Sequence, residues 1–220
     1  MSEKGETTDT QTENYWTLNT PFTIAPEPGD PVARYVPLLL RLSLYVFLTW
    51  FLIEAMPFFY SYSPNVYPPR LIWIFRTFTF LPLHEGGHIL FILFGRTLYA
   101  LGGSFWQIMF AVLWFAIALK QKSQVAPFPL FWVGENMMDV SLYIRDSQDM
   151  VLPLLGGHKS GHDWHFLLTK WDLIDSCQEI ADIMYYSGVF ISIVAIIGGI
   201  VWAGVAFYKS ATPLAPKMID

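Results

Sequence analysis

The sequence predicts an all-α membrane protein: a polytopic helical bundle of about five transmembrane helices with a His-rich polar loop. Five apolar segments, separated by proline, glycine and charged residues, are each long enough to cross a bilayer. The chain of 220 residues is 54% hydrophobic, and its mean hydropathy is +0.40. Charged residues make up 14% of the chain, against about a quarter in soluble domains. These observations together favour an integral membrane protein.

Net charge and cysteine content exclude several classes of function. The formal net charge of −5 argues against a nucleic-acid-binding surface. Cys177 is the only cysteine, so an internal disulfide and a cysteine-based zinc site are both excluded. Any metal must therefore be held by His, Asp or Glu. The first thirty residues are polar and contain several prolines, so we expect no cleavable signal peptide and expect the first apolar span to direct insertion.

The domain organisation follows from where the apolar segments lie. Residues 1–31 are expected to form a polar, Pro-rich tail, and residues 211–220 a short C-terminal tail. Between them, residues 32–210 form the membrane domain. Its spans are expected at about residues 32–56, 71–94, 98–119, 125–144 and 183–208, with a polar loop at residues 145–179.

The first two spans end or bend at prolines. Pro57 is expected to end the first span, because proline removes a backbone donor and crowds the preceding turn. Pro82 lies inside the second span and predicts a bend there. Gly86 and Gly87 remove side-chain bulk just beyond this bend, so another helix or a substrate can approach closely.

The third and fourth spans carry polar side chains in apolar surroundings. Gln107 is expected to hydrogen-bond a neighbouring helix or to face a site. The polar residues of the fourth span predict that one of its faces looks inward, toward protein or water. They are Glu135, Asn136 and Asp139. The fifth span is apolar, and we expect it to serve packing only.

An odd number of spans predicts termini on opposite sides of the membrane. We expect the third and fourth spans to pack on the second. Alternate spans run parallel, so the late parts of the second and fourth spans are expected at the same membrane face. Lys and Arg are spread over both sides of this layout, so the positive-inside rule assigns no orientation.

The strongest functional signal is the motif H-E-x-x-H at residues 84–88, inside the second span. On a helix, His84 and His88 are four residues apart and share one face, so both imidazoles can bind one Zn²⁺. Glu85 is one position off that face, so it is expected to act as a catalytic general base on water rather than as a ligand. Ionisable side chains are costly inside a membrane, which favours a functional role for all three.

The five histidines of the chain fall into two clusters. Two lie in the motif, and His158, His162 and His165 lie in the polar loop. Surface histidines would be expected to scatter along the sequence. The clustering therefore favours a loop that folds over the metal site or binds a second metal. A flexible polar loop is the alternative interpretation.

These residues resemble the site-2-protease class of intramembrane zinc metalloproteases, and most closely an uncharacterised branch of it with the H-E-x-x-H motif. The resemblance covers about residues 82–175. Beyond the motif it rests on Gly102-Gly103-Ser104 with Gln107, Tyr143-Ile144-Arg145-Asp146, Gly156-Gly157 and His162-Asp163-Trp164. It implies a third ligand, an Asp, from a later span.

The third metal ligand is expected to be Asp146, with His162 and Asp163 as alternatives. Asp146 follows the fourth span and lies at the membrane face to which the second span brings His88. Its carboxylate is a usual third ligand in hydrolytic zinc sites. The loop histidines leave the same end of the fourth span. If His162 occupied the position that water needs, the site would be closed and structural or regulated.

The resemblance implies a zinc-dependent intramembrane peptidase that hydrolyses a membrane-embedded peptide, with a transmembrane protein as substrate and Zn²⁺ as cofactor. The alternative is a non-catalytic structural subunit of a larger membrane complex, which the aromatic content of 17% favours. A transporter that moves protons or metal ions is a third hypothesis. The expected partners are substrate or complex subunits and lipid, not nucleic acid, in a multi-pass protein of a bacterial inner membrane.

Overall fold

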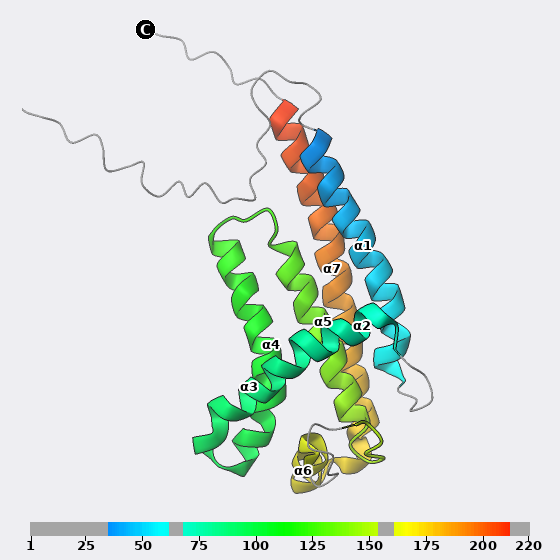
Figure 1. The fold of residues 1–220 in the computed structure, drawn as a ribbon, viewed down its shortest axis with the longest axis vertical. Helices are drawn as coiled ribbons and strands as arrows, with labels where there is room; N and C mark the ends of the chain where they lie inside the picture. Colours follow the sequence, from blue (N-terminus) through cyan, green and yellow to red (C-terminus); the bar gives the residue numbers. More distant parts are fainter. Residues whose placement is uncertain (1–34, 62–67, 154–160, 212–220) are drawn as a thin grey trace, which may run out of the picture.

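The computed structural model describes residues 35–61, 68–153 and 161–211. These residues form helices joined by short turns, with no strand among them, so the predicted all-α bundle is confirmed (Figure 1). The elements are α1 (Tyr35–Tyr60), α2 (Arg70–Phe75), η1 (Arg76–Phe80), α3 (Leu81–Phe91), η2 (Ile92–Phe94), α4 (Arg96–Lys120), α5 (Pro127–Arg145), α6 (Asp163–Lys170), η4 (Ile174–Ser176) and α7 (Cys177–Ala211). The N-terminal tail, residues 212–220 and His158 lie outside the described residues.

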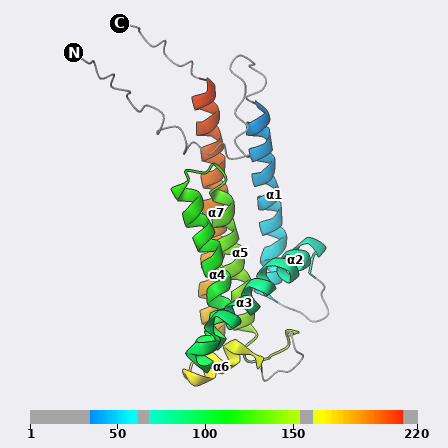
Figure 2. The ribbon, with the colours of Figure 1, turned by 60° about the vertical axis from the view of Figure 1, so that its left-hand side comes forward.

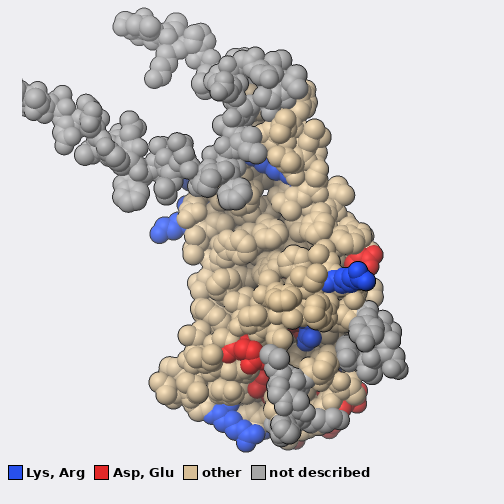
Figure 3. All heavy atoms as spheres, in the orientation of Figure 1, with Lys and Arg blue, Asp and Glu red and all other residues tan. Residues whose placement is uncertain are grey.

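Four helical segments are long and apolar enough to cross a membrane. They are Tyr35–Tyr60, Arg70–Phe94, Arg96–Lys120 and Ile174–Ser210. Their exposed faces carry large apolar side chains, including Leu93, which is 90% exposed, and Ile183, which is 71% exposed. Figure 3 shows a face of the bundle on which large areas carry no charged side chain, with most of the charged side chains toward the two ends and in the lower half. Such a surface suits contact with lipid.

The fourth predicted span, residues 125–144, corresponds to α5, which lies in the centre of the bundle. It carries three charged residues, Glu135, Asp139 and Arg145, in 19 residues, and most of its side chains are buried. The helix packs between α4 and α7 (Figure 1). A Cβ added to Gly134 would lie 2.5 Å from the backbone oxygen of Gly188 on α7, so only glycine permits this close approach. The polar groups of α5 are therefore covered by protein.

The segment that carries the H-E-x-x-H motif crosses the bundle obliquely (Figures 1 and 2). Its helix widens into a π-turn at η1, where the N–H of Leu81 bonds the carbonyl oxygen of Arg76. Pro82 follows at once. A proline cannot donate to the preceding turn and crowds it, and a widened turn relieves that crowding. The sequence predicted a bend at this proline, and the helix changes geometry directly before it.

The described ends of the chain lie at the same end of the bundle. The rings of Tyr35, at the start of α1, and Phe207, near the end of α7, have centroids 5.1 Å apart. The sequence predicted termini on opposite sides of the membrane, whereas this arrangement favours the same side. The reason is the oblique segment: α1, α4, α5 and α7 run lengthwise, which is an even number, whereas α2–α3 runs across (Figure 1). The third and fourth spans were predicted to pack on the second. The third span, α4, packs closely on α3, whereas the fourth, α5, contacts the second span mainly at η1.

Candidate metal site

The two motif histidines lie side by side on α3. Their ring centroids are 4.8 Å apart and their planes are inclined by 82°. Both side chains are buried, with exposed fractions of 8% for His84 and 7% for His88. The helical spacing of four residues places both imidazoles on the face that packs against α4. This confirms the predicted shared face.

Glycines allow α3 and α4 to approach closely at the motif. A Cβ added to Gly87 would lie 2.2 Å from the backbone oxygen of Gly102. A Cβ added to Gly103 would lie 2.7 Å from Nε2 of His84 and 2.8 Å from Cε1 of His88. The imidazoles therefore occupy the space that a side chain at position 103 would need.

The third group at the histidines is Asp163, the first residue of α6. Its Oδ2 lies 3.4 Å from Nε2 of His84 and 3.2 Å from Nε2 of His88. One ligand atom from each of the three residues lies within 4.8 Å of the others. Burial raises the pKa of Asp163, but hydrogen bonds with the two imidazoles more than offset this and leave the pKa below its usual value. The carboxyl group is therefore ionised at neutral pH.

Hydrogen bonds to the other ring nitrogens orient both imidazoles. Nδ1 of His88 lies 2.8 Å from the carbonyl oxygen of Tyr99, which can only accept, so this nitrogen carries the proton. Nδ1 of His84 lies 3.3 Å from Oε1 of Gln107. Gln107 donates through Nε2 to Asp139 at 2.8 Å, so its oxygen is the atom that faces His84. With Nδ1 protonated, a neutral imidazole can offer its Nε2 lone pair to a metal ion, and in the imidazolium form the same nitrogen donates to Asp163.

This donor set fits a divalent metal ion. Two imidazole nitrogens and one carboxylate oxygen converge on one place, and a divalent cation can bind all three. Two His and one carboxylate are the protein ligands of many catalytic zinc sites. Metal-binding histidines usually donate their other N–H to a carbonyl or carboxylate, as both do here. His84, His88 and Asp163 are thus the residues that could hold the metal.

A polar network runs from the imidazoles through α4 and α5 and back to the π-turn of the same membrane segment. Nε of Arg76, in the π-turn, lies 2.7 Å from Oδ1 of Asp139. The chain of contacts therefore runs from Arg76 through Asp139 and Gln107 to His84. The sequence identified Gln107 and Asp139 as polar groups inside spans. It did not predict that Arg76 joins them, which links η1, α4 and α5.

The structure does not bring Asp146 to the histidines of the motif. Asp146 accepts from the backbone N–H groups of Val151 at 2.8 Å and Leu152 at 3.1 Å. Its Oδ2 also lies 3.2 Å from Nε2 of His162. These contacts bind it to the turn after α5, so Asp163 takes the geometric place that the sequence assigned first to Asp146. Asp163 had been one of the two alternatives.

His162 is not one of the three grouped donors, because both of its ring nitrogens contact other groups. Its Nε2 faces Asp146, and its Nδ1 accepts the backbone N–H of His165 at 3.2 Å, so it caps the N-terminus of α6. The cap places Asp163 at the first position of the helix. Tyr143 accepts the N–H of Asp163 at 3.1 Å, and its hydroxyl lies 3.4 Å from Oδ2 of Asp163. Neither the cap nor the tyrosine contact could be read from residue spacing.

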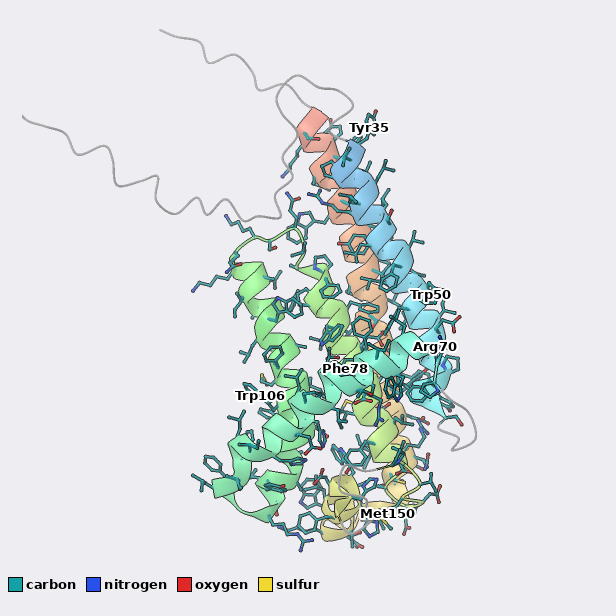
Figure 4. The ribbon with its side chains drawn as sticks, in the orientation of Figure 1. Tyr35, Trp50, Arg70, Phe78, Trp106 and Met150 are labelled. Atoms are coloured by element: carbon teal, nitrogen blue, oxygen red, sulfur yellow. The ribbon has the colours of Figure 1, made fainter. Side chains whose placement is uncertain are left out.

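A cavity of about 540 Å³ opens onto the three donors. Glu85 lines it beside His84 and His88, on the side of α3 where the sequence placed a general base. Further lining residues include Arg76, Arg96, Tyr99, Gln107, Asp139, Tyr143, His162 and Phe166. The cavity lies in the part of the bundle far from Tyr35 and toward Met150 (Figure 4). The arrangement combines three groups that could hold a metal ion, a carboxyl side chain at the same cavity and room for a ligand.

No protein-family model, curated protein or solved structure matches this chain.

Proposed function

We propose that the protein is a zinc-dependent intramembrane peptidase of the site-2-protease type. The observation that carries the proposal is the convergence of His84 Nε2, His88 Nε2 and Asp163 Oδ2 next to Glu85 in one cavity. The helix that carries the histidines is apolar enough to lie in a membrane. A metal site in that setting fits a hydrolase whose substrate reaches it from the lipid.

Each residue of the site has a separate role in the proposed peptide hydrolysis. Zinc at this position supplies Lewis acidity, which polarises a peptide carbonyl and makes water a stronger acid. Glu85 accepts a proton from the attacking water and donates it to the leaving amine. Gln107 and the carbonyl of Tyr99 hold the imidazoles in the tautomer that exposes Nε2. Tyr143 holds the carboxylate of Asp163 in place.

An open coordination position favours catalysis over a structural metal. Structural zinc sites usually have four protein ligands, whereas catalytic sites have three. Among the described residues, the group contains three donors. A non-catalytic subunit of a membrane complex remains the competing function, because it could keep the metal without turnover. In the proposed role the protein is multi-pass, resides in a bacterial inner membrane and acts on a transmembrane protein.

Metal analysis and one substitution test the proposal. Purified protein is expected to hold about one zinc per chain, and chelation is expected to stop cleavage. The Glu85→Gln variant should keep its zinc and lose activity by about 100-fold or more, because it loses acid–base catalysis. The assay is cleavage of synthetic single-span peptides in liposomes, followed by mass spectrometry.

Glu54→Gln is the matched control, because Glu54 is an exposed carboxylate on α1 and does not line the cavity. It should cleave like the wild type. Unchanged turnover in Glu85→Gln contradicts the hydrolase. Bound zinc without cleavage of any peptide favours the structural subunit.

A further inference from the structure

One charged side chain at the cavity has no role in the proposed hydrolysis. Arg96, the first residue of α4, lines the cavity and is exposed, so it lies where the cavity opens. Its guanidinium lies over the ring of Phe166, 4.2 Å from the centroid. Phe166 also lines the cavity. The stack holds the planar guanidinium at the opening without using its N–H groups.

The other charged groups around the cavity are mostly paired. Arg76 pairs with Asp139, and Asp163 faces the two imidazoles. Glu85 is needed for proton transfer. Within the described part of the chain, Arg96 has no carboxylate within ion-pair distance. Its N–H donors are therefore available to a ligand that enters the cavity.

The position of Arg96 relative to the metal donors determines how far along a bound peptide its guanidinium would lie from the cleaved bond. It lies three residues before Tyr99, whose ring stacks on His88 with centroids 4.7 Å apart. Phe166 lies three residues after Asp163 on α6. By each route Arg96 is thus about one helical turn, which rises about 5.4 Å, plus one ring contact from the site. An extended peptide advances about 3.3 Å per residue, so the guanidinium is about two or three residues from the reacting bond.

We propose that Arg96, held by Phe166, is a subsite for a carboxylate of the peptide substrate. The carboxylate belongs either to an acidic side chain near the cleaved bond or to the C-terminus of the peptide. A guanidinium presents two parallel N–H donors that match a carboxylate, and these charge-assisted hydrogen bonds are among the stronger ones. The inference rests on the proposed function for its peptide ligand, and it restricts the substrate class to peptides with an acid close to the cleavage point.

Peptide binding tests the subsite without hydrolysis. Full-length Glu85→Gln protein in phosphatidylcholine nanodiscs is titrated with fluorescent apolar hexapeptides, and binding is read by anisotropy. One pair differs only in a C-terminal carboxylate or amide. A second pair carries a C-terminal amide and differs only in Asp or Asn at one position. One acidic member should bind roughly tenfold tighter than its neutral partner, and the pair that shows this identifies the source of the carboxylate.

Substitutions then assign the preference to the guanidinium. Adding Arg96→Gln should abolish the preference while leaving binding of the neutral peptides unchanged. Adding Arg96→Lys should keep part of it, because the charge remains but the planar fork is lost. Arg70→Gln is the matched control, since Arg70 is exposed and does not line the cavity. It should keep the full preference.

Two outcomes would overturn the subsite: a preference that survives Arg96→Gln, or equal binding within both pairs, which includes the case of a guanidinium that binds lipid instead. The last would appear as no preference in either pair, together with phosphatidylglycerol retained in native mass spectrometry by the parent and lost by Arg96→Gln. Failure of the proposed function is separate. Without zinc or cleavage, an acid preference that depends on Arg96 still identifies a peptide-binding site.

Discussion

The carboxylate of Asp163 is held by contacts on three sides. The two imidazoles face its Oδ2, and Tyr143 contacts both its carboxylate and its backbone N–H. Three helices, α3, α5 and α6, therefore meet at one side chain. A ligand held in this way loses little freedom when it binds a metal ion, which favours tight binding.

Replacing this carboxylate should remove the metal. Asp163→Ala leaves two imidazoles, and zinc affinity is expected to fall by about 100-fold or more because a charged ligand is lost. Zinc content after dialysis against a weak chelator measures this. Asp149→Ala is the control, because Asp149 is an exposed carboxylate at the same end of the bundle. Full zinc occupancy in Asp163→Ala would rule this residue out as a ligand.

Sequence reasoning identified the two histidines but not which carboxylate joins them. The spacing of His84 and His88 fixes their shared face on any helix, so the motif alone predicts the pair. Asp146 and Asp163 both lie in the polar region after the fourth span. Asp146 is not available to the histidines because it accepts hydrogen bonds from the backbone N–H groups of Val151 and Leu152. That contact depends on the path of the turn, which residue types do not specify.

At the scale of elements, the close contact of α3 and α4 makes position 103 sensitive. A methyl group at Gly103 would meet the imidazole of His84, so Gly103→Ala should push the ring aside and weaken zinc binding about tenfold or more. Gly86→Ala is the matched control, because a Cβ at Gly86 meets nothing within 4 Å. Zinc titration of both variants compares them. Equal affinities would show that the imidazoles do not need this space.

The N-terminus of α6 offers a second test of how an element places a ligand. His162→Ala removes the cap from the helix that begins with Asp163, and zinc affinity is expected to fall about 10-fold. His162→Asn should restore most of it, because asparagine is a strong N-cap but replaces no metal ligand. If alanine and asparagine weaken binding equally, His162 acts by another route than capping.

The helices themselves were easier to predict than their directions. Each predicted span coincides with a long helical segment, because the length of an apolar segment can be counted directly in the sequence. The region predicted as a polar loop, residues 145–179, contains a short helix, α6, that was not predicted. The oblique path of α2–α3 could not be predicted, because hydropathy gives length but not tilt. The π-turn before Pro82 was also missed, since a proline predicts a disturbed turn but not its form.

For the whole molecule, the oblique segment determines the topology. Cysteine substitutions at Val36 and Ser210 should both react with an impermeant maleimide from one side of the membrane, in a Cys177→Ser background. Cysteine at Asp175 should react from the other side, because α6 and the start of α7 lie at the opposite end of the bundle (Figure 1). Labelling of intact and inverted vesicles measures this. Reaction at positions 36 and 210 from opposite sides would restore the five-crossing layout.

The donors of the candidate metal site are far apart in the order of synthesis. His84 and His88 leave the ribosome first, and Asp163 follows only after α4 and α5. A nascent chain therefore carries an incomplete set of ligands until most of its helices have entered the membrane. Proteolytic chemistry at this site would begin only when insertion is nearly finished, so newly made copies could not cut neighbouring chains while still in the translocon.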